Sequence, residues 1–176
     1  SIMCADHPVI LEITNIGVIN ISVDGDKIIK KKNINLGMAA ALPDGNLIVP
    51  VIKNADQLNL VGMAKRVNDL AGRARVNQLK PDEIQGGTYT VTNVGTFGSI
   101  MGTPIINQPQ VGILSVDAIT KRPVVVEGPT GDSIAIRLVG ILSQSFDHRA
   151  IDGSYSAAFL HRIRTLLEEK DWSDEF

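Results

Sequence analysis

The chain has 176 residues, of which 44% are hydrophobic and 20% are charged, and these values are ordinary for one globular domain with a sizeable core. The formal net charge of -2 argues against nucleic acid as the main partner, because neutralising phosphates requires a basic surface. No apolar run is long enough to span a bilayer and the N-terminus lacks a signal-peptide layout, which predicts a protein of the cytoplasm, or of the mitochondrial matrix, with no membrane partner. The single cysteine, Cys4, cannot form an internal disulfide and fits a reducing compartment.

The first half of the chain is predicted to contain short strands joined by tight turns, followed by one helix. Strands are expected over residues 9–16, 18–23, 27–31, 34–42 and 46–52. Turns are expected at Asp24-Gly25 and at Pro43-Asp44-Gly45, because an Asp-Gly pair between apolar runs favours a hairpin. Apolar residues recur at helical spacing over residues 58–79, which predicts a helix there, and Pro81 is expected to stop it.

The second half is predicted to add strands over residues 88–94, 111–119, 123–127 and 134–145. A glycine-rich loop is expected at 95–102 and a turn at 128–131. Phe159, Ile163, Leu166 and Leu167 form an apolar stripe that predicts a helix over 153–170. The whole pattern indicates a single domain of residues 1–176 in the α+β class, with a mixed sheet and few helices, ending in an acidic tail at 171–176.

The most informative segment runs from Asp147 to Gly153, between a buried strand and a helix start. It holds two carboxylates, one imidazole and one guanidinium, and His148 is the side chain best suited to proton exchange near neutral pH. An equally open alternative is a helix N-cap at Asp152 with His148 as an ordinary loop residue. A metal site is a third interpretation, but it would need His7 or His161 as a further ligand.

A second segment places hydroxyl groups at Thr88, Thr90 and Thr92 on one face of a strand. Threonine is common in strands for reasons of local preference alone. Alternatively, one of these hydroxyls could donate a hydrogen bond to a developing oxyanion. The glycines that follow would allow a ligand or a neighbouring chain to approach closely.

Four motifs carry a resemblance to a known family. The strings DGNLIVPVIKNAD, GGTYTVTNVGTFGS, GTPIINQPQVGIL and DHRAIDG resemble, in this order, the catalytic domain of dihydrolipoamide acyltransferases, the E2 components of 2-oxo acid dehydrogenase complexes. The resemblance covers residues 18–172. It implies the chloramphenicol acetyltransferase-like fold, a two-layer sandwich of a mixed sheet and helices. It also implies homotrimers that assemble into a larger octahedral or icosahedral cubic core.

The resemblance assigns roles to particular residues. It makes His148 the base that takes a proton from a thiol of coenzyme A or dihydrolipoamide, with both molecules as substrates and no metal. It makes Thr92, commonly a serine in the family, the donor that stabilises the tetrahedral intermediate from a neighbouring subunit. It makes Asp152 the residue that holds the loop through a salt bridge. Supporting roles fall to Asp147, Arg149, Gly153, Asn93 and Gly95, with Arg149 pairing with Asp147, Asp152 or another carboxylate and Gly153 relieving the backbone.

The implied activity is acyl transfer between dihydrolipoamide and coenzyme A, with a succinyl or branched-chain acyl group favoured over acetyl. The alternatives are a non-catalytic scaffold of such a complex and a chloramphenicol-type O-acetyltransferase. The region before Val18 is short for the family, which predicts that N-terminal helices are missing. The lipoyl and subunit-binding domains are expected to be absent, so the E1 and E3 enzymes and the lipoyl group would attach elsewhere. Lys27 is interpreted as a structural residue of a hairpin, although a lipoylated lysine also occupies a hairpin turn.

Overall fold

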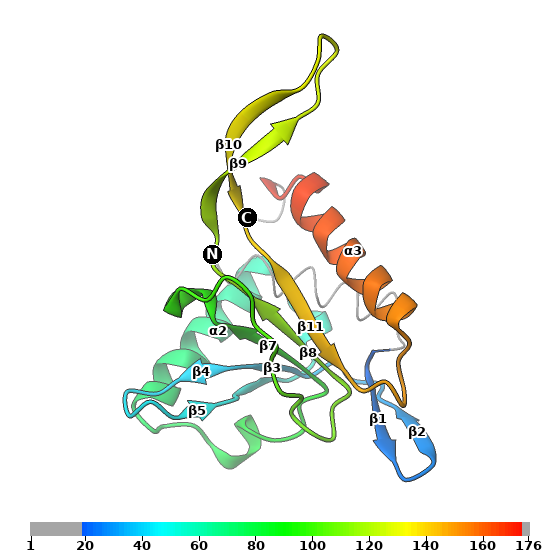
Figure 1. Cartoon of the computed structure of the whole chain (residues 1–176). Coiled ribbons are helices and arrows are strands. Elements are labelled where there is room, and N and C mark those ends of the chain that lie inside the picture. Colours follow the sequence, from blue (N-terminus) through cyan, green and yellow to red (C-terminus); the bar gives the residue numbers. More distant parts are fainter. Residues whose placement is uncertain (1–18, 174–176) are drawn as a thin grey trace.

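A computed structural model describes residues 19–173 of the chain (Figure 1). The expected strand at 9–16, the question of N-terminal helices, and the residues Cys4 and His7 lie outside the described part. None of the helices within residues 19–173 is both long and apolar enough to cross a membrane.

The centre of the fold is a five-stranded mixed sheet. Its order is β11 (Leu142–Phe146), β8 (Gly112–Val116), β7 (Tyr89–Asn93), β3 (Leu36–Met38) and β6 (Val51–Ile52). The central strand β7 runs parallel to both β3 and β8, whereas the outer strands β11 and β6 are antiparallel to their neighbours. The α+β class with a mixed sheet is therefore confirmed.

Two long helices, α2 (Leu60–Arg75) and α3 (Gly153–Glu169), pack on one face of this sheet. Asn59 caps α2, because its side chain accepts a hydrogen bond from the Gly62 amide at 2.8 Å. The helices and the sheet share one apolar cluster, in which the rings of Tyr89 and Phe159 meet edge to face with centroids 5.7 Å apart. Burial of this cluster supplies the main stabilisation of the domain.

The opposite face of the sheet is polar. Thr92, Ser115 and Ser143 are aligned across β7, β8 and β11, so their side chains form a row of hydroxyls on that face. Because β7 and β8 are parallel neighbours, the chain between them must travel back along the sheet. This connection, residues 94–111, crosses the polar face: the Ser143 hydroxyl donates to the carbonyl of Gly102.

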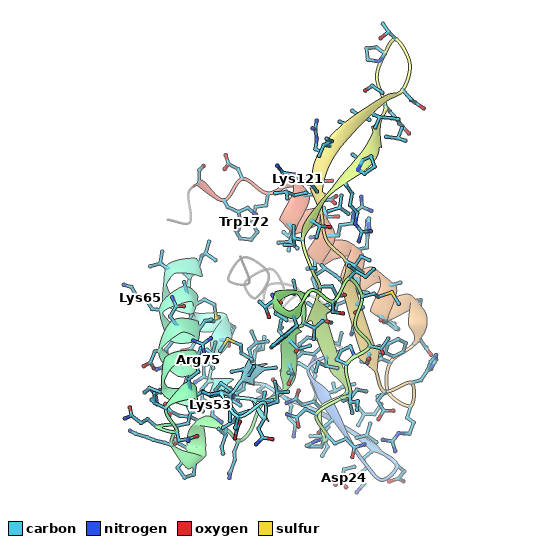
Figure 2. All side chains as sticks on the ribbon, turned by 60° about the vertical axis from the view of Figure 1, so that its left-hand side comes forward. Asp24, Lys53, Lys65, Arg75, Lys121 and Trp172 are labelled. Carbon is cyan, nitrogen blue, oxygen red and sulfur yellow. The ribbon has the colours of Figure 1, made fainter. Side chains whose placement is uncertain are left out.

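Three hairpins lie outside the central sheet. They are β1 (Ile21–Asp24) with β2 (Lys27–Lys30), β4 (Ala40–Ala41) with β5 (Leu47–Ile48), and β9 (Thr120–Val126) with β10 (Ser133–Val139). The β9–β10 hairpin projects away from the sheet (Figure 1), and Figure 2 shows its side chains standing on both sides of the ribbon. Short 3-10 helices are η1 (Ala55–Gln57), η2 (Pro81–Glu83) and η3 (Gly95–Phe97).

Several predicted elements are shorter than the hydrophobic pattern indicates. The strand expected at 34–42 is divided into β3 and β4, and that at 46–52 into β5 and β6, because each half pairs with a different partner. The strand expected at 134–145 is interrupted at Gly140 and Ile141, where the chain leaves β9 and joins β8. These corrections share one cause, since hydrophobic periodicity does not report a change of pairing partner.

The observed positions of a helix end and of a hairpin turn also differ from the predicted ones. The helix expected to reach residue 79 ends at Arg75, and Asn77 takes a left-handed conformation with φ 55°. The first hairpin turns at Gly25-Asp26 rather than Asp24-Gly25, since Asp24 pairs with Lys27 across the strands. Gly25, with φ +60°, supplies the positive dihedral that the first central position of such a turn requires.

Candidate active site

His148 lies in a tight turn that connects β11 to α3. The turn is fixed at its start, where the Asp147 amide donates to the Val111 carbonyl at 2.8 Å, and it closes on itself, because the Ala150 and Ile151 amides donate to the Asp147 carbonyl at 3.0 and 3.1 Å. At its end the Ile151 side chain is buried in the core. The backbone beneath His148 is therefore held at both ends by a rigid scaffold.

An ion pair and hydrogen bonds between Asp147 and Arg149 stabilise this turn. The Asp147 carboxylate accepts the Arg149 amide at 3.0 Å and also receives the guanidinium, with Nη2 to Oδ2 at 2.7 Å. The hydrogen bonds from the Arg149 side chain hold the pKa of Asp147 below its usual range, and the same contact raises the pKa of Arg149. Of the partners considered for Arg149, the structure shows Asp147.

The imidazole of His148 is exposed. Its ring lies 5.3 Å from the ring of Phe146, at an interplanar angle of 43°. Within residues 19–173 it makes no hydrogen bond, so both ring nitrogens are open to a ligand. An exposed base on a braced turn is the arrangement that proton transfer to or from a docked substrate requires.

Two expectations about the end of this turn need correction. Asp152 occupies the N-cap position of α3, but its side chain makes no capping hydrogen bond, and no arginine in the described part of the chain pairs with it. Gly153 has no positive φ, and an added Cβ would meet no atom within 4 Å. The predicted cap position is therefore correct, whereas the capping hydrogen bond is absent and the backbone does not require glycine. A salt bridge of Asp152 is not formed within residues 19–173.

The three threonine hydroxyls of the second segment have different surroundings. Thr88 bonds to Asn35, and Thr90 donates to the Gln110 side chain at 2.6 Å, so both serve the structure. Thr92 is half-buried near the carboxyl end of β7, and its hydroxyl makes no hydrogen bond to residues 19–173. Thr92 is consequently the threonine whose hydroxyl is free to donate to a ligand.

The residues after Thr92 fix the strand end. The Asn93 side chain accepts the Thr96 amide at 3.2 Å. Gly95 lies so close to the segment that follows β8 that a Cβ would lie 2.5 Å from the carbonyl carbon of Asp117. A larger residue at Gly95 would therefore require the backbone at Asp117 and Ala118 to shift.

Sequence reasoning missed a polar pair beside Thr92. Ser115, the partner of Thr92 across the strands, donates to Asp117 at 2.9 Å, and both residues are buried. The available signal was a serine in an otherwise apolar strand, with an aspartate directly after the strand. The pair reinforces the polar character of the face that carries Thr92.

Thr92 and His148 are not brought together within one chain. Thr92 pairs with Ser115, whereas Phe146, the last residue of β11, pairs with Gly112. With about 3.3 Å per residue and about 4.8 Å between strands, Thr92 and Phe146 are roughly 14 Å apart, and His148 lies two residues farther on. In the roles that the family resemblance implies, His148 would contact the attacking thiol and Thr92 the oxygen of the carbonyl that is attacked. These reacting groups approach to about 3 Å, so a single chain does not bring both side chains to one such centre.

Two cavities lie in the described part of the chain near the central sheet. One cavity, of about 490 Å³, lies near the amino end of β7, and the residues that line it include Lys31, Asn35 and Gln110. The other, of about 1100 Å³, includes Asn93 and Asp117 together with residues of α3. Neither of these two cavities is lined by Thr92 or His148.

Within the described residues, no group of three or more His, Cys, Asp or Glu side chains could hold a metal ion. His161 is exposed on α3, as expected for a surface residue, and Lys27 is exposed in β2.

Comparison with protein-family models identifies one match, over residues 9–172, to 2-oxoacid dehydrogenases acyltransferase (catalytic domain). Among curated relatives, the lipoamide acyltransferase component of the branched-chain alpha-keto acid dehydrogenase complex of Bacillus subtilis is 48% identical over 147 residues, covering 84% of this chain and 34% of the relative. The succinyltransferase component of the 2-oxoglutarate dehydrogenase complex of the same organism is 42% identical over 154 residues, covering 88% and 36%. The chain thus spans about a third of the length of these relatives.

Solved structures share the fold. A probable dihydrolipoamide acetyltransferase from Listeria monocytogenes matches with a TM-score of 0.90 and 40% identity, covering 96% of this chain and 70% of that one. The dihydrolipoamide acetyltransferase of Azotobacter vinelandii, studied for the role of a serine, a histidine and an asparagine in its catalytic mechanism, gives 0.83 and 35%, covering 96% and 67%. The cubic core of a pyruvate dehydrogenase multienzyme complex gives 0.82 and 35%, covering 93% and 68%.

Proposed function

The chain belongs to the family of 2-oxoacid dehydrogenase acyltransferase catalytic domains, and on that premise we propose that it transfers an acyl group between dihydrolipoamide and coenzyme A. The observation that carries the proposal is the exposed His148 on its braced turn. The acyl group is succinyl or branched-chain, the groups carried by the two Bacillus subtilis relatives. The proposal uses both thiols as substrates and assigns no step to a metal.

The spacing of the site supports this assignment. In the Azotobacter vinelandii enzyme the catalytic histidine and asparagine are four positions apart. His148 and Asp152 have the same separation, so Asp152 stands where that enzyme has asparagine. Since Asp152 makes no capping bond or arginine pair within residues 19–173, its side chain is available to a substrate or a neighbouring subunit.

The proposed reaction begins with proton transfer. His148 accepts the proton of the attacking thiol, whose pKa is about 8.5 when free, and the sulfur forms a bond to the thioester carbonyl carbon. The resulting oxyanion receives a hydrogen bond from the Thr92 hydroxyl. Collapse of the intermediate breaks the bond to the leaving sulfur, which takes the proton back from His148. Base catalysis of this kind contributes on the order of 10²–10⁴-fold to the rate.

Because Thr92 and His148 lie at different ends of the sheet, the active site combines Thr92 of one subunit with His148 of another. The assembly proposed is a homotrimer, which provides three equivalent sites of this kind. Trimers then build a larger core, as in the cubic core to which the fold is similar. E1 and E3 enzymes are the proposed partners of the complex, and the bacterial relatives favour a cytoplasmic location.

The test is a steady-state assay with coenzyme A and acyl-dihydrolipoamide, using acetyl, succinyl and branched-chain donors. His148→Ala should lower the turnover number at least about 10²-fold, since it removes the base. His161→Ala is the matched control, because that histidine is exposed on α3, away from the turn, and it should retain wild-type rates.

The outcomes of this assay distinguish the proposed function from its alternatives. Equal rates for His148→Ala and the wild type would refute the role of His148. An assembled wild-type chain with no transfer to any acceptor thiol would favour the non-catalytic scaffold. Transfer to chloramphenicol in place of coenzyme A would identify an O-acetyltransferase.

A further inference from the structure

The charges around the Thr92 end of the sheet are unevenly distributed. None of the five strands β11, β8, β7, β3 and β6 contains Lys, Arg, Asp or Glu, although 20% of all residues are charged. The first charged residue after β8 is Asp117, and it is buried, with 2% of its surface exposed. The next basic residues, Lys121 and Arg122, belong to β9, in the hairpin that projects away from the sheet (Figure 1).

Asp117 lies on the same face of the sheet as Thr92. Thr92 pairs with Ser115 on the adjacent parallel strand, and the Ser115 hydroxyl donates to the Asp117 carboxylate at 2.9 Å. With about 4.8 Å between strands and about 3.3 Å per residue, the Cα atoms of Thr92 and Asp117 are roughly 8 Å apart. The charge of Asp117 can therefore act on a group held at Thr92 without touching that group.

The Asp117 carboxylate is only partly satisfied. Its Oδ1 accepts the Ser115 hydroxyl, whereas its Oδ2 has no hydrogen-bond partner within residues 19–173. A Cβ added to Gly102 would lie 3.1 Å from Oδ1, so the connection 94–111 covers the carboxylate, and this connection contains no Lys or Arg. A charge buried in this way is screened much less by salt and water than an exposed one.

In the proposed shared site, further charged groups come from the His148 turn of another subunit. Its Arg149 is already paired with Asp147 at 2.7 Å, so these two charges neutralise each other. Asp152 adds a carboxylate that makes no capping hydrogen bond. The charges that the two subunits bring to the site are therefore negative in sum, which is unfavourable for an anionic acyl group.

We propose that Asp117 selects among acyl groups, so that the chain transfers uncharged branched-chain acyl groups in preference to succinyl. The inference rests on the proposed function, because it concerns the acyl group whose thioester oxygen accepts a hydrogen bond from Thr92. A succinyl group held there places a second carboxylate about 10 Å from that of Asp117, and at an effective dielectric constant of about 20 their repulsion lowers transfer roughly tenfold. A branched-chain acyl group carries no charge and meets no such repulsion.

Two donors of the same shape separate the effect of charge from that of size. The wild type is assayed for kcat/KM with coenzyme A and with isobutyryl-, succinyl- or succinamoyl-dihydrolipoamide, the last being succinyl with an uncharged amide in place of its carboxylate. Succinyl should be transferred about tenfold less efficiently than succinamoyl and isobutyryl. Equal values of kcat/KM for succinyl and succinamoyl would overturn the proposal, and this comparison requires no variant.

Asp117→Asn removes the charge but keeps an oxygen that accepts the Ser115 hydroxyl. It should raise kcat/KM for succinyl about tenfold and leave the values for succinamoyl and isobutyryl within about twofold of the wild type. Asp56→Asn is the matched control, because it removes the same charge from an exposed position in η1. Asp56 follows β6, at the opposite end of the sheet from Thr92, and its substitution should leave all three values unchanged.

Thermal unfolding monitored by circular dichroism establishes that each variant is folded. An unchanged ratio of succinyl to succinamoyl transfer in folded Asp117→Asn, or an equal change in Asp56→Asn, would overturn the role of Asp117. If Asp117→Asn does not fold, the comparison of donors with the wild type decides. A wild type that transfers none of the three acyl groups would refute the proposed function, whereas transfer of succinyl as efficient as that of succinamoyl would leave this function intact and overturn only the selectivity.

Discussion

Thr92, on β7, and His148, in the turn after β11, lie toward opposite ends of the five-stranded sheet, and β8 separates their two strands. Each is locally prepared for its role: Thr92 has a free hydroxyl within the described residues, and His148 stands on a turn braced by Asp147 and Ile151. Because of this separation, the proposed mechanism predicts that each active site combines Thr92 of one subunit with His148 of another.

Mixing two inactive variants should restore activity. Thr92→Ala retains His148, and His148→Ala retains Thr92, so a subunit interface between the two contains one intact pair. After joint unfolding and reassembly at equal concentrations, random mixing predicts about a quarter of the wild-type turnover. The measurement is acyl transfer by the mixture against each variant assembled alone.

A mixture of His148→Ala with itself, carried through the same reassembly, controls for recovery of material. Activity of the mixed sample no greater than the sum of the two separate variants would show that Thr92 and His148 act within one chain or that one of them has no catalytic role.

The hydroxyl of Thr92, rather than its methyl group, should be required. Thr92→Val keeps the shape of the side chain but removes the donor, and it should lower the turnover number by about 10²–10³-fold with a small change in KM. Thr92→Ser should keep most of the activity. In the Azotobacter vinelandii enzyme the serine precedes the histidine by 52 positions. Thr96 has that separation from His148 without a gap, so Thr96→Ala is the informative control and should be fully active.

Loss of activity in Thr96→Ala with full activity in Thr92→Val would transfer the role to Thr96. Thr96 is exposed in η3, and its amide is already held by Asn93.

Much of the fold can be predicted from local pattern. The prediction for helix α3 lies within one residue of its observed end, because its apolar stripe is regular and Gly153 follows the turn. Asp-Gly pairs mark two of the hairpins. The strand predicted at 134–145 fails at Gly140, where one apolar run serves two separate ladders, and only the three-dimensional pairing reveals that division.

The sequence predicts that His148 lies in a turn before a helix, and the structure confirms that position, but the contacts within the turn cannot be predicted fully. The motif around His148 indicates the right turn, yet it cannot decide which carboxylate Arg149 contacts. The answer, Asp147, follows from the tight turn that places its carboxylate near both the amide and the guanidinium of Arg149. The buried pair of Ser115 and Asp117 escapes prediction because an apolar pattern gives no reason to expect a carboxylate in the core.

Two glycines of the candidate site should respond differently to alanine. In Gly95→Ala the new methyl group would meet the Asp117 backbone at 2.5 Å, so the free energy of unfolding should fall by about 1–3 kcal/mol. Gly153→Ala places a methyl group in open space in the first turn of α3 and should leave stability unchanged or raise it by up to about 1 kcal/mol. Urea unfolding measures both, and a larger loss for Gly153→Ala would contradict the observed geometry.

An ion-pair cluster joins the end of α2 to η2 and should make stability depend on acid pH. Arg73 bonds to Asp69 on its own helix and to both carboxylate oxygens of Glu83 at 2.6 Å. Glu83 also accepts the Lys80 amide at 2.8 Å. The Arg73 guanidinium, followed by that amide, lowers the pKa of Glu83 to about 2. The folded state therefore binds the Glu83 proton more weakly than the unfolded chain does.

Because the folded pKa is depressed, the stabilisation by Glu83 is fully present above the ordinary glutamate range and is lost as pH falls toward 2. Glu83→Gln should consequently lower the melting temperature at pH 7, and the difference from the wild type should shrink between about pH 5 and pH 2. Glu168→Gln, which removes an exposed partner of Arg164, is the control and should change the melting temperature little at any pH. A constant difference between Glu83→Gln and the wild type across this range would show that the charge of Glu83 does not stabilise the fold.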